Sequence, residues 1–435
     1  MQVVESERKI PVYKRAEVVI AGGGPSGIMA AVTCARKGIK TLLVERYGFL
    51  GGMATVGLVG PFSGFAIRGE RVLGGFPWEF VSRIREKGGA IVIEGTGNIA
   101  FDPEAVKIVA QRMLEEEGCD IILHSLVVGA IVEKGEIKGI IVENKSGRGA
   151  ILGKVVIDAT GDADIAHFCG AEYEKTAELQ PMSLCFRMGN VDTDNLSNLF
   201  LGSDIKRSPN GANPQIREKM IKAYREGELS LFGGPWILYG STVREGEVSL
   251  NVTRVAGDAT DAEEITRAEL KAREDMHKIV EFLKKNFTPF RNSFILDSAL
   301  QIGIRETRRI TGEYKLTAND ILKYADFPDS IARGCHPIDI HDFRSEKQRI
   351  IRLKRWYSIP YRCMIPQKVE NLVVTGRAIS STREAFASVR VQGTCMALGQ
   401  AAGCAAALCV GERKTPRKLN WELLRGELKK QGALV

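Results

Sequence analysis

A glycine-rich turn between a strand pattern and a helix pattern constrains the fold of this chain more than any other feature. The β-branched run Glu17–Ala21 (EVVIA) leads directly into Gly22-Gly23-Gly24-Pro25-Ser26-Gly27, and apolar residues then recur at helical spacing. A second apolar run, Thr41–Val44, ends at Glu45. This order of strand, tight turn, helix and strand predicts a βαβ unit.

The glycine spacing in this turn is that of a dinucleotide-binding fingerprint, with an acidic residue 18 positions after Gly27. The first glycine permits the turn, the second lets the backbone approach a pyrophosphate, and the third lets the helix pack on the strand. The N-terminus of the helix adds a partial positive charge, and Glu45 is suited to accept hydrogen bonds from ribose hydroxyls. The predicted dinucleotide-binding residues of this unit are Gly22, Gly24, Pro25, Ser26, Gly27, Glu45 and Arg46.

The next part of the chain predicts a loop, a helix and a β-meander. The stretch after Glu45 is too rich in glycine for regular structure, and Asp102-Pro103-Glu104 predicts the start of a helix that ends at Glu117. Three β-rich segments follow, which we expect to form an antiparallel meander. They are Leu126–Glu133, Ile137–Asn144 and Ala150–Thr160.

The pattern changes after residue 180. Isolated strands and a long amphipathic helix, Glu263–Lys285, predict an inserted domain, and a buried strand at Asn371–Thr375 precedes a helix of small residues that starts near Gly393-Thr394. We therefore expect an α/β fold with a Rossmann-like dinucleotide-binding domain that includes the meander, interrupted by an α+β substrate or cap domain. The predicted bounds are 1–180, 181–345 and 346–435.

Charge and cysteine content limit the class of protein. The net charge of +8 is scattered without a dense basic tract, so we expect no nucleic-acid partner. The nine cysteines form no Cys-x-x-Cys pair, so we expect neither disulfides nor a metal site. The polar N-terminus lacks a signal-peptide core, and the apolar stretch Cys395–Gly411 is short for a membrane span, which predicts a cytoplasmic protein without a membrane partner.

Six stretches of the sequence resemble the FAD-dependent oxidoreductases of the glutathione reductase-like superfamily, near the fumarate reductase and succinate dehydrogenase flavoprotein branch. The resemblance extends over nearly the whole chain and implies FAD as cofactor. It rests on VVIAGGGPSGIMAA, LLVERYGFLGGMAT, VVIDATGDADIA, LNVTRVAGDATD, QIGIRETRRITGEY and NLVVTGRAISSTREAFASVRVQGTCMALGQAAGCAAAL.

The resemblance implies further FAD contacts. Gly51, Gly52 and Thr55 would lie along the diphosphate and flavin, and Val127 would contact the adenine. Thr160, Gly161 and Asp162 would lie beside the adenosine and pyrophosphate. Gly376-Arg377 matches the place where relatives often have Gly-Asp or Gly-Glu at the ribityl chain, so the arginine is a departure from the family pattern. The helix at Gly393 and Thr394 would direct its N-terminus at the flavin edge.

Arginines near these motifs predict an anionic substrate. The resemblance places Arg390 just ahead of the flavin-edge helix, and Arg305 or Arg308 could form an opposing clamp, because guanidinium groups bind carboxylates and phosphates in bidentate fashion. A structural salt-bridge network is the alternative role for the Arg305–Arg309 cluster. His336 and His341 fit a metal site, ordinary core or surface histidines, or a substrate-site acid or base.

The sequence therefore predicts an enzyme that transfers hydride between FAD and a small anionic organic substrate. The alternatives are a flavoprotein that modifies RNA and a non-catalytic FAD-binding protein. The electron donor or acceptor is unknown, and a homo-oligomer is a possibility.

We expect the FAD to be held noncovalently, because no His or Cys occurs between Cys34 and Cys119 to form the usual link to the flavin. Acid precipitation of the purified yellow protein should leave the flavin in the supernatant, as read by its absorbance. A yellow pellet would contradict this prediction and indicate a covalent link elsewhere in the chain.

Overall fold

The parallel sheet expected from the βαβ pattern is present at the centre of the molecule. The computed structural model describes residues 3, 7, 9–93, 95–196, 214–238 and 242–435. Five parallel strands are ordered β24-β13-β2-β3-β9, so a strand from the C-terminal part of the chain lies at one edge. The predicted α/β class is confirmed. The strands are β2 (Val18–Ala21), β3 (Thr41–Val44), β9 (Asp120–Ile122), β13 (Val155–Asp158) and β24 (Leu372–Val374).

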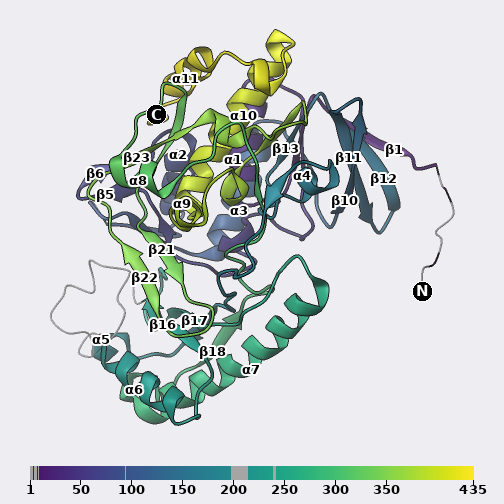
Figure 1. Cartoon of the computed structure of the whole chain (residues 1–435). Coiled ribbons are helices and arrows are strands. Elements are labelled where there is room, and N and C mark those ends of the chain that lie inside the picture. The colour runs from purple at the N-terminus through teal and green to yellow at the C-terminus, as the bar shows by residue number, and fades with distance from the viewer. Residues whose placement is uncertain (1–2, 4–6, 8, 94, 197–213, 239–241) are drawn as a thin grey trace.

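Two helices from opposite ends of the sequence pack against each other beside this sheet (Figure 1). Helix α1 (Pro25–Arg36) has its proline in the first turn, and the chain leaves it through Gly38 at a φ of +74°. Helix α10 (Gln392–Glu412) is apolar around most of its circumference and is buried along most of its length. Although α10 is long and apolar enough to cross a membrane, 83% of its most apolar window is buried inside the protein. It is therefore the core helix of this fold.

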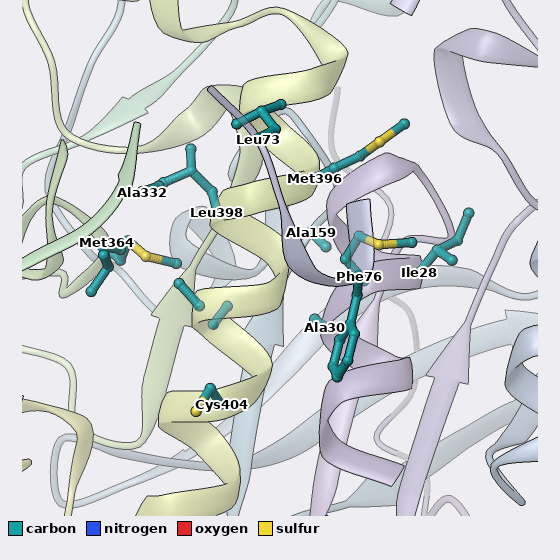
Figure 2. Packing of buried hydrophobic residues seen from close by; sticks show 14 of the residues in the cluster. Ile28, Ala30, Leu73, Phe76, Ala159, Ala332, Met364, Met396, Leu398 and Cys404 are labelled. Atoms are coloured by element: carbon teal, nitrogen blue, oxygen red, sulfur yellow. The ribbon is translucent and has the colours of Figure 1, made fainter. Parts of the chain in front are cut away.

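The contact between α1 and α10 is a backbone contact, made where α10 has glycine. Figure 2 shows buried side chains of the same apolar cluster, among them Ala30 of α1 and Leu398 of α10. A Cβ added at Gly399 would lie 2.1 Å from the carbonyl oxygen of Ser26, and one added at Gly403 would lie 2.3 Å from that of Ala30. The thiol of Cys34 donates to the carbonyl of Gly403 at 3.2 Å. Both pairs increase in residue number together, so the two helices run parallel.

The meander forms a separate sheet, and one predicted segment of it was wrong. Strands β10 (Leu126–Glu133) and β11 (Glu136–Asn144) pair as expected. The segment predicted as one strand over residues 150–160 is instead two strands, β12 (Gly147–Leu152) in the meander and β13 in the parallel sheet. The chain crosses between sheets at Gly153, where a Cβ would lie 2.8 Å from Cγ2 of Val19. Strand β1 (Val12–Arg15) completes this sheet beside β12.

A further four-stranded sheet, with its own apolar core, lies below the parallel sheet in Figure 1. Its antiparallel order is β16-β17-β15-β18. Its buried apolar residues are Leu58 and side chains between Met182 and Ile304, and we call this unit the antiparallel lobe. It comprises β15 (Phe186–Gly189), α5 (Thr193–Leu196), α6 (Pro214–Arg225), β16 (Phe232–Leu238), β17 (Val248–Thr253), α7 (Ala262–Asn286) and β18 (Phe294–Ser298).

The predicted domain bounds stay a prediction, although the apolar packing changes near residue 304. Buried side chains from Leu316 to Ile365 join the same cluster as α1 and α10, not that of the antiparallel lobe. The predicted helices near 102–117 and 263–285 are confirmed as α3 (Pro103–Glu116) and α7, each capped by an aspartate side chain, Asp102 or Asp261.

The other elements cover the parallel sheet or connect the two lobes. They are η1 (Gly52–Ala54), β4 (Phe62–Ser63), β5 (Ala66–Ile67), β6 (Glu70–Arg71), α2 (Gly75–Glu86), β7 (Ala90–Val92), β8 (Asn98–Phe101), α3 (Pro103–Glu116), α4 (Asp164–Phe168), β14 (Tyr173–Glu174), η4 (Thr288–Phe290), β19 (Arg309–Ile310), α8 (Ala318–Lys323), β20 (Ser330–Gly334), β21 (Ile338–His341), β22 (Gln348–Ile351), β23 (Tyr357–Pro360), η5 (Tyr361–Met364), η6 (Gly376–Ala378), α9 (Arg383–Val389), η7 (Pro416–Lys418) and α11 (Trp421–Lys430).

Two glycine-to-alanine changes in α10 should have opposite effects on stability. Gly399→Ala forces the backbones of α1 and α10 apart and should lower the free energy of unfolding by about 1–3 kcal/mol or more. Gly411→Ala in the same helix meets nothing within 4 Å and should be neutral or stabilise by roughly 0.5–1 kcal/mol through helix propensity. Thermal unfolding midpoints test this. Equal midpoints for the two variants would contradict the close backbone contact.

Candidate functional site

A cavity of about 740 Å³ extends from the glycine-rich turn to the antiparallel lobe. Its walls come from the carboxyl ends of β2, β3 and β13, from β10 of the meander, from residues 301–305 and from residues 335–353. The start of α10 closes another side, through Gln392 and Cys395. Ligands of open α/β sheets bind at this edge of the strands, so the cavity lies where the fold predicts a site.

The glycine-rich turn is held so that its backbone borders the cavity. Gly22 has a φ of +103°, and a Cβ there would lie 2.5 Å from the carbonyl oxygen of Ala159. A Cβ on Gly27 would lie 1.8 Å from the carbonyl oxygen of Gly22, so this residue must be glycine for the turn to close. Gly24 differs, because a Cβ there meets only Cα of Gly52, at 3.8 Å. The space beside Gly24 belongs to the cavity, together with Pro25 and Ser26 of the first turn of α1.

Glu45 lies at the end of β3, and its carboxylate is anchored by the loops on both sides. Oε2 accepts from the backbone N–H of Gly23 at 2.6 Å, and Oε1 accepts from that of Tyr47 at 3.0 Å. Burial raises the pKa of Glu45, while these two backbone donors oppose the rise. A carboxylate oxygen can accept more than one hydrogen bond, so Glu45 retains acceptor capacity toward a ligand in the cavity.

An ion pair occupies the place where the sequence departs from the family pattern. Nη2 of Arg377 donates to Oδ1 of Asp162 at 2.6 Å, and the hydroxyl of Thr307 donates to the same oxygen at 2.6 Å. A Cβ on Gly161 would lie 2.8 Å from Nη1 of Arg377, so the guanidinium lies directly against the Gly161 backbone. The acid expected after Gly376 is thus replaced by a basic group that is itself paired with an acid from the end of β13.

Polar atoms at the start of α10 are left without a partner. Oγ1 of Thr394 and Oε1 of Gln392 are buried and make no hydrogen bond within the part of the chain that the structure describes. Buried polar atoms are costly unless they are satisfied. Of these two residues Gln392 lines the cavity, so its free Oε1 fits a polar ligand at this helix N-terminus. Together with the open space at Gly24 and the anchored Glu45, this atom fits a dinucleotide that extends from α1 to α10.

The structure brings most of the predicted site residues to this one cavity. Those that line it are Gly22, Gly24, Pro25, Ser26, Glu45, Arg46, Gly52, Val127, Thr160, Gly161, Asp162, Gly376, Arg377, Arg305 and Arg390.

The other predicted site residues lie behind the cavity wall. The N–H of Gly51 donates to the carbonyl of Gly23 at 2.9 Å, and the hydroxyl of Thr55 donates to the carbonyl of Leu50 at 2.9 Å. Arg308 donates to Oδ1 of Asp164 at 2.9 Å, which is the salt-bridge role considered for this cluster. These residues shape the walls without facing the cavity, and Gly27, Gly393 and Thr394 belong to the same group.

Two arginines lie at the far end of the cavity, Arg305 buried and Arg390 largely buried, with its side chain 14% exposed. Arg305 is 8% exposed and donates to the carbonyl of Pro181 and the hydroxyl of Ser183, at 2.7 and 2.8 Å, and to the amide oxygen of Asn251 at 3.0 Å. Arg390 donates to the backbone carbonyl of Asp339 at 3.1 Å, and its Nη2 lies 3.7 Å from the Asp339 carboxylate. Arg390 is thus paired with an acid of β21, Asp339.

A third buried arginine, Arg254, was missed at the sequence level. It is 3% exposed and donates to the Ser183 hydroxyl at 2.5 Å and to Oδ1 of Asn251 at 3.1 Å. Its Nη2 also lies 3.4 Å from Nδ1 of His341. It stands behind the cavity wall and holds side chains that face the cavity. Its position directly after the apolar strand pattern that became β17 could have indicated it, because a charged side chain next to a buried strand needs polar partners.

The two histidines of the CHPIDIHD stretch both line the cavity and differ in their hydrogen bonds. His341 is engaged at both nitrogens, with Nε2 3.1 Å from Oδ2 of Asp339 and Nδ1 toward Arg254. His336 is engaged at one nitrogen, with Nδ1 2.9 Å from the carbonyl oxygen of Pro337. Among the described residues, no three His, Cys, Asp or Glu side chains are placed to hold a metal ion.

A family model described as FAD-dependent oxidoreductase matches residues 17–428 of the chain. The chain belongs to the FAD-dependent oxidoreductase family. FAD is therefore the cofactor of this enzyme, and the predicted Rossmann-like fold with an additional domain is confirmed. The residues around Gly24, Glu45 and the start of α10 are the ones that fit this cofactor.

Curated relatives match only parts of this oxidoreductase. The digeranylgeranylglycerophospholipid reductase of Thermoplasma volcanium is 26% identical over 204 residues, which cover 43% of this chain and 50% of the relative. The thiamine thiazole synthase of Methanococcus vannielii is 31% identical over 163 residues, covering 34% of this chain and 58% of the relative. The chain thus spans about half the length of the curated relatives it matches.

Among solved structures, a triple variant of the flavin-dependent brominase Bmp2 has a similar fold. It is 14% identical with a TM-score of 0.51, and the match covers 95% of this chain and 84% of the brominase. At this identity the similarity supports the fold and not the reaction.

Replacement of Gly24 by valine should remove FAD without unfolding the protein. The added Cβ meets only Gly52 in the protein, and the side chain would enter the cavity where the pyrophosphate is expected. Purified Gly24→Val should be colourless and fail to take up added FAD, with a circular dichroism spectrum like that of the parent. Gly426→Val, at a helix position outside the cavity where an added Cβ meets nothing within 4 Å, is the control and should stay yellow. A yellow Gly24→Val protein would contradict the placement of FAD at this turn.

Proposed function

We propose that this FAD-dependent oxidoreductase transfers hydride between FAD and a small anionic organic substrate bound at the arginine end of the cavity. The observation that supports this most is the buried excess of positive charge beside the cavity. Arg254 and Arg305 are buried there and Arg390 is largely buried, and Asp339 is the one carboxylate within ion-pair distance of any of them in the described chain.

The excess of buried positive charge destabilises the protein when no anion is bound. Within the part of the chain that the structure describes, Arg254 and Arg305 form no ion pair and bind only neutral groups. Burial lowers the pKa of Arg305, with a further decrease from the charges of Arg254 and Arg390, and burial lowers the pKa of Arg254 to about 10. A buried charge is stabilised by an opposite charge, so an anion in this cavity would relieve the cost.

The two cavity-facing arginines could also orient the substrate. Arg305 follows the antiparallel lobe, whereas Arg390 directly precedes α10, so an anion between them would contact both parts of the protein. Guanidinium groups bind carboxylates in fixed geometry, which favours a defined position of the reacting carbon. When bound, FAD supplies two-electron hydride chemistry. The role of the chain is to bind the anion, to fix its orientation and to exclude water.

Several statements remain predictions from the sequence. They are the cytoplasmic location, the lack of nucleic-acid and membrane partners, the possibility of a homo-oligomer and the identity of the electron partner.

Lysine in place of Arg390 should weaken anion binding while FAD stays bound. Loss of a charged hydrogen bond costs about 1.5–3 kcal/mol, which corresponds to a dissociation constant raised roughly 10- to 100-fold. The probe is oxalate, titrated into the yellow protein and followed by the change in flavin absorbance. Arg344→Lys changes a side chain that is 73% exposed and serves as control. An unchanged oxalate affinity in Arg390→Lys would contradict the proposed anion site.

A further inference from the structure

His336 presents an unpartnered ring nitrogen to the cavity that holds the proposed anion site. We propose that Nε2 of His336 accepts the hydroxyl proton of the substrate, and that the substrate is an α-hydroxycarboxylate whose carboxylate lies between Arg305 and Arg390. This inference rests on the proposed function and adds a substrate class and a proton-transfer residue to it.

The hydrogen bond at Nδ1 determines which nitrogen of His336 is free. The Pro337 carbonyl is an acceptor only, so Nδ1, 2.9 Å away, must be the nitrogen that holds the hydrogen. In the neutral imidazole, Nε2 then has a free lone pair. Nε2 makes no hydrogen bond within the described chain. The atom is also not fully buried. Because His336 lines the cavity, this lone pair is accessible from it.

His341 is the alternative proton acceptor and fits the role less well. Its Nε2 faces the carboxylate of Asp339, and its Nδ1 faces Arg254, which can only donate. Both nitrogens are therefore engaged by the protein. His341 holds Asp339 in place, whereas His336 is the histidine with capacity left for a ligand.

The backbone of His336 is held rigidly. The hydroxyl of Ser388 donates to the carbonyl oxygen of His336 at 2.5 Å, and the hydroxyls of Ser388 and Tyr357 are 2.8 Å apart. Both Ser388 and Tyr357 are buried. A proton acceptor must keep its distance to the substrate within hydrogen-bond range, and this anchoring serves that requirement.

Burial favours the neutral imidazole of His336. Burial lowers the pKa of His336, Asp339 and the hydrogen bond to Pro337 raise it, and the charge of Arg390 lowers it. The other charged or titratable groups at or behind this part of the cavity wall are Arg305, Arg254, His341, Arg352, Cys185, Cys335 and Cys395. At neutral pH the imidazole is therefore unprotonated and can accept a proton.

The step balances with the cofactor that the family uses. The C–H bond of the hydroxyl-bearing carbon breaks, and its electron pair leaves as hydride to FAD. The O–H bond breaks, its proton binds Nε2 of His336, and a C=O bond forms, so the hydroxy acid is oxidised to a keto acid and FAD is reduced. A hydroxyl supplies a proton that imidazole can accept as the C–H bond breaks, whereas oxidation of a saturated C–C bond would require a proton from carbon.

The test compares His336→Gln, with His336→Asn as a second variant, against the parent and the exposed-site control His277→Gln. The first measurement is the oxalate dissociation constant of the yellow protein as a function of pH. In the parent, protonation of His336 adds a positive donor, so oxalate should bind more tightly as the pH falls through the pKa of His336. Both His336 variants should bind oxalate at neutral pH within a few-fold of the parent and lose this pH dependence.

The second measurement is the anaerobic rate of flavin bleaching by glycolate, lactate, malate and mandelate. In the parent the rate should fall on acidification, because protonated Nε2 cannot accept a proton. The His336 variants should be slower by about 10²- to 10⁴-fold and lack this acid limb. His277→Gln should behave as the parent does.

The outcomes separate this inference from the function on which it rests. Oxalate that binds neither the parent nor the control would overturn the proposed anion site as well. Oxalate binding that weakens in Arg390→Lys but keeps its pH dependence in both His336 variants would overturn only the role of His336. Binding of oxalate with bleaching by none of the four hydroxy acids would overturn the substrate class.

Discussion

The backbone contact between α1 and α10 is the constraint on which the rest of the structure depends. Gly399 and Gly403 allow the two helices to approach until a single added carbon would overlap a carbonyl oxygen of the partner helix. Ser26 of α1 lies beside Gly399 of α10. Helix α1 begins one residue before Ser26, whereas α10 begins seven residues before Gly399. The N-terminus of α10 therefore extends about 9 Å beyond that of α1. Both positive helix ends thus face one cavity at different depths.

Charge distribution separates the two ends of that cavity. At the end beside α1, Glu45 is anchored by backbone donors, and Asp162 is paired with Arg377. At the far end, two buried arginines and the largely buried Arg390 exceed the carboxylates near them, although unpaired buried charge opposes folding. The proposed anion would compensate this charge, which makes the arginine end the part of the site on which the proposal for the substrate class depends.

The sequence predicted the cofactor half of the molecule better than the substrate half. The turn, Glu45 and the Asp102 cap of α3 depend on residues close in the chain, so local spacing and capping chemistry were sufficient to predict them. The third meander segment was wrong because a continuous apolar run does not reveal that Gly153 moves the chain from one sheet to another.

The arginine end could be predicted only in part. Asn251, Arg305, His336 and Arg390 meet through tertiary packing across 139 residues of sequence, and no periodicity connects them. The free nitrogen of His336 depends on one hydrogen bond to a neighbouring carbonyl, which residue type alone does not determine.

The position of Arg390 directly before α10 has a consequence for how this family can diversify. The helix whose start lines the cavity and the arginine of the proposed anion site belong to one segment, held against α1 at its glycines. Asn251 and the segment leading to Arg305 instead belong to a lobe with a separate apolar core. Mutations in that lobe can reshape one wall of the cavity without disturbing the helix pair, so selection can change the substrate while the cofactor and its nearest arginine are inherited intact.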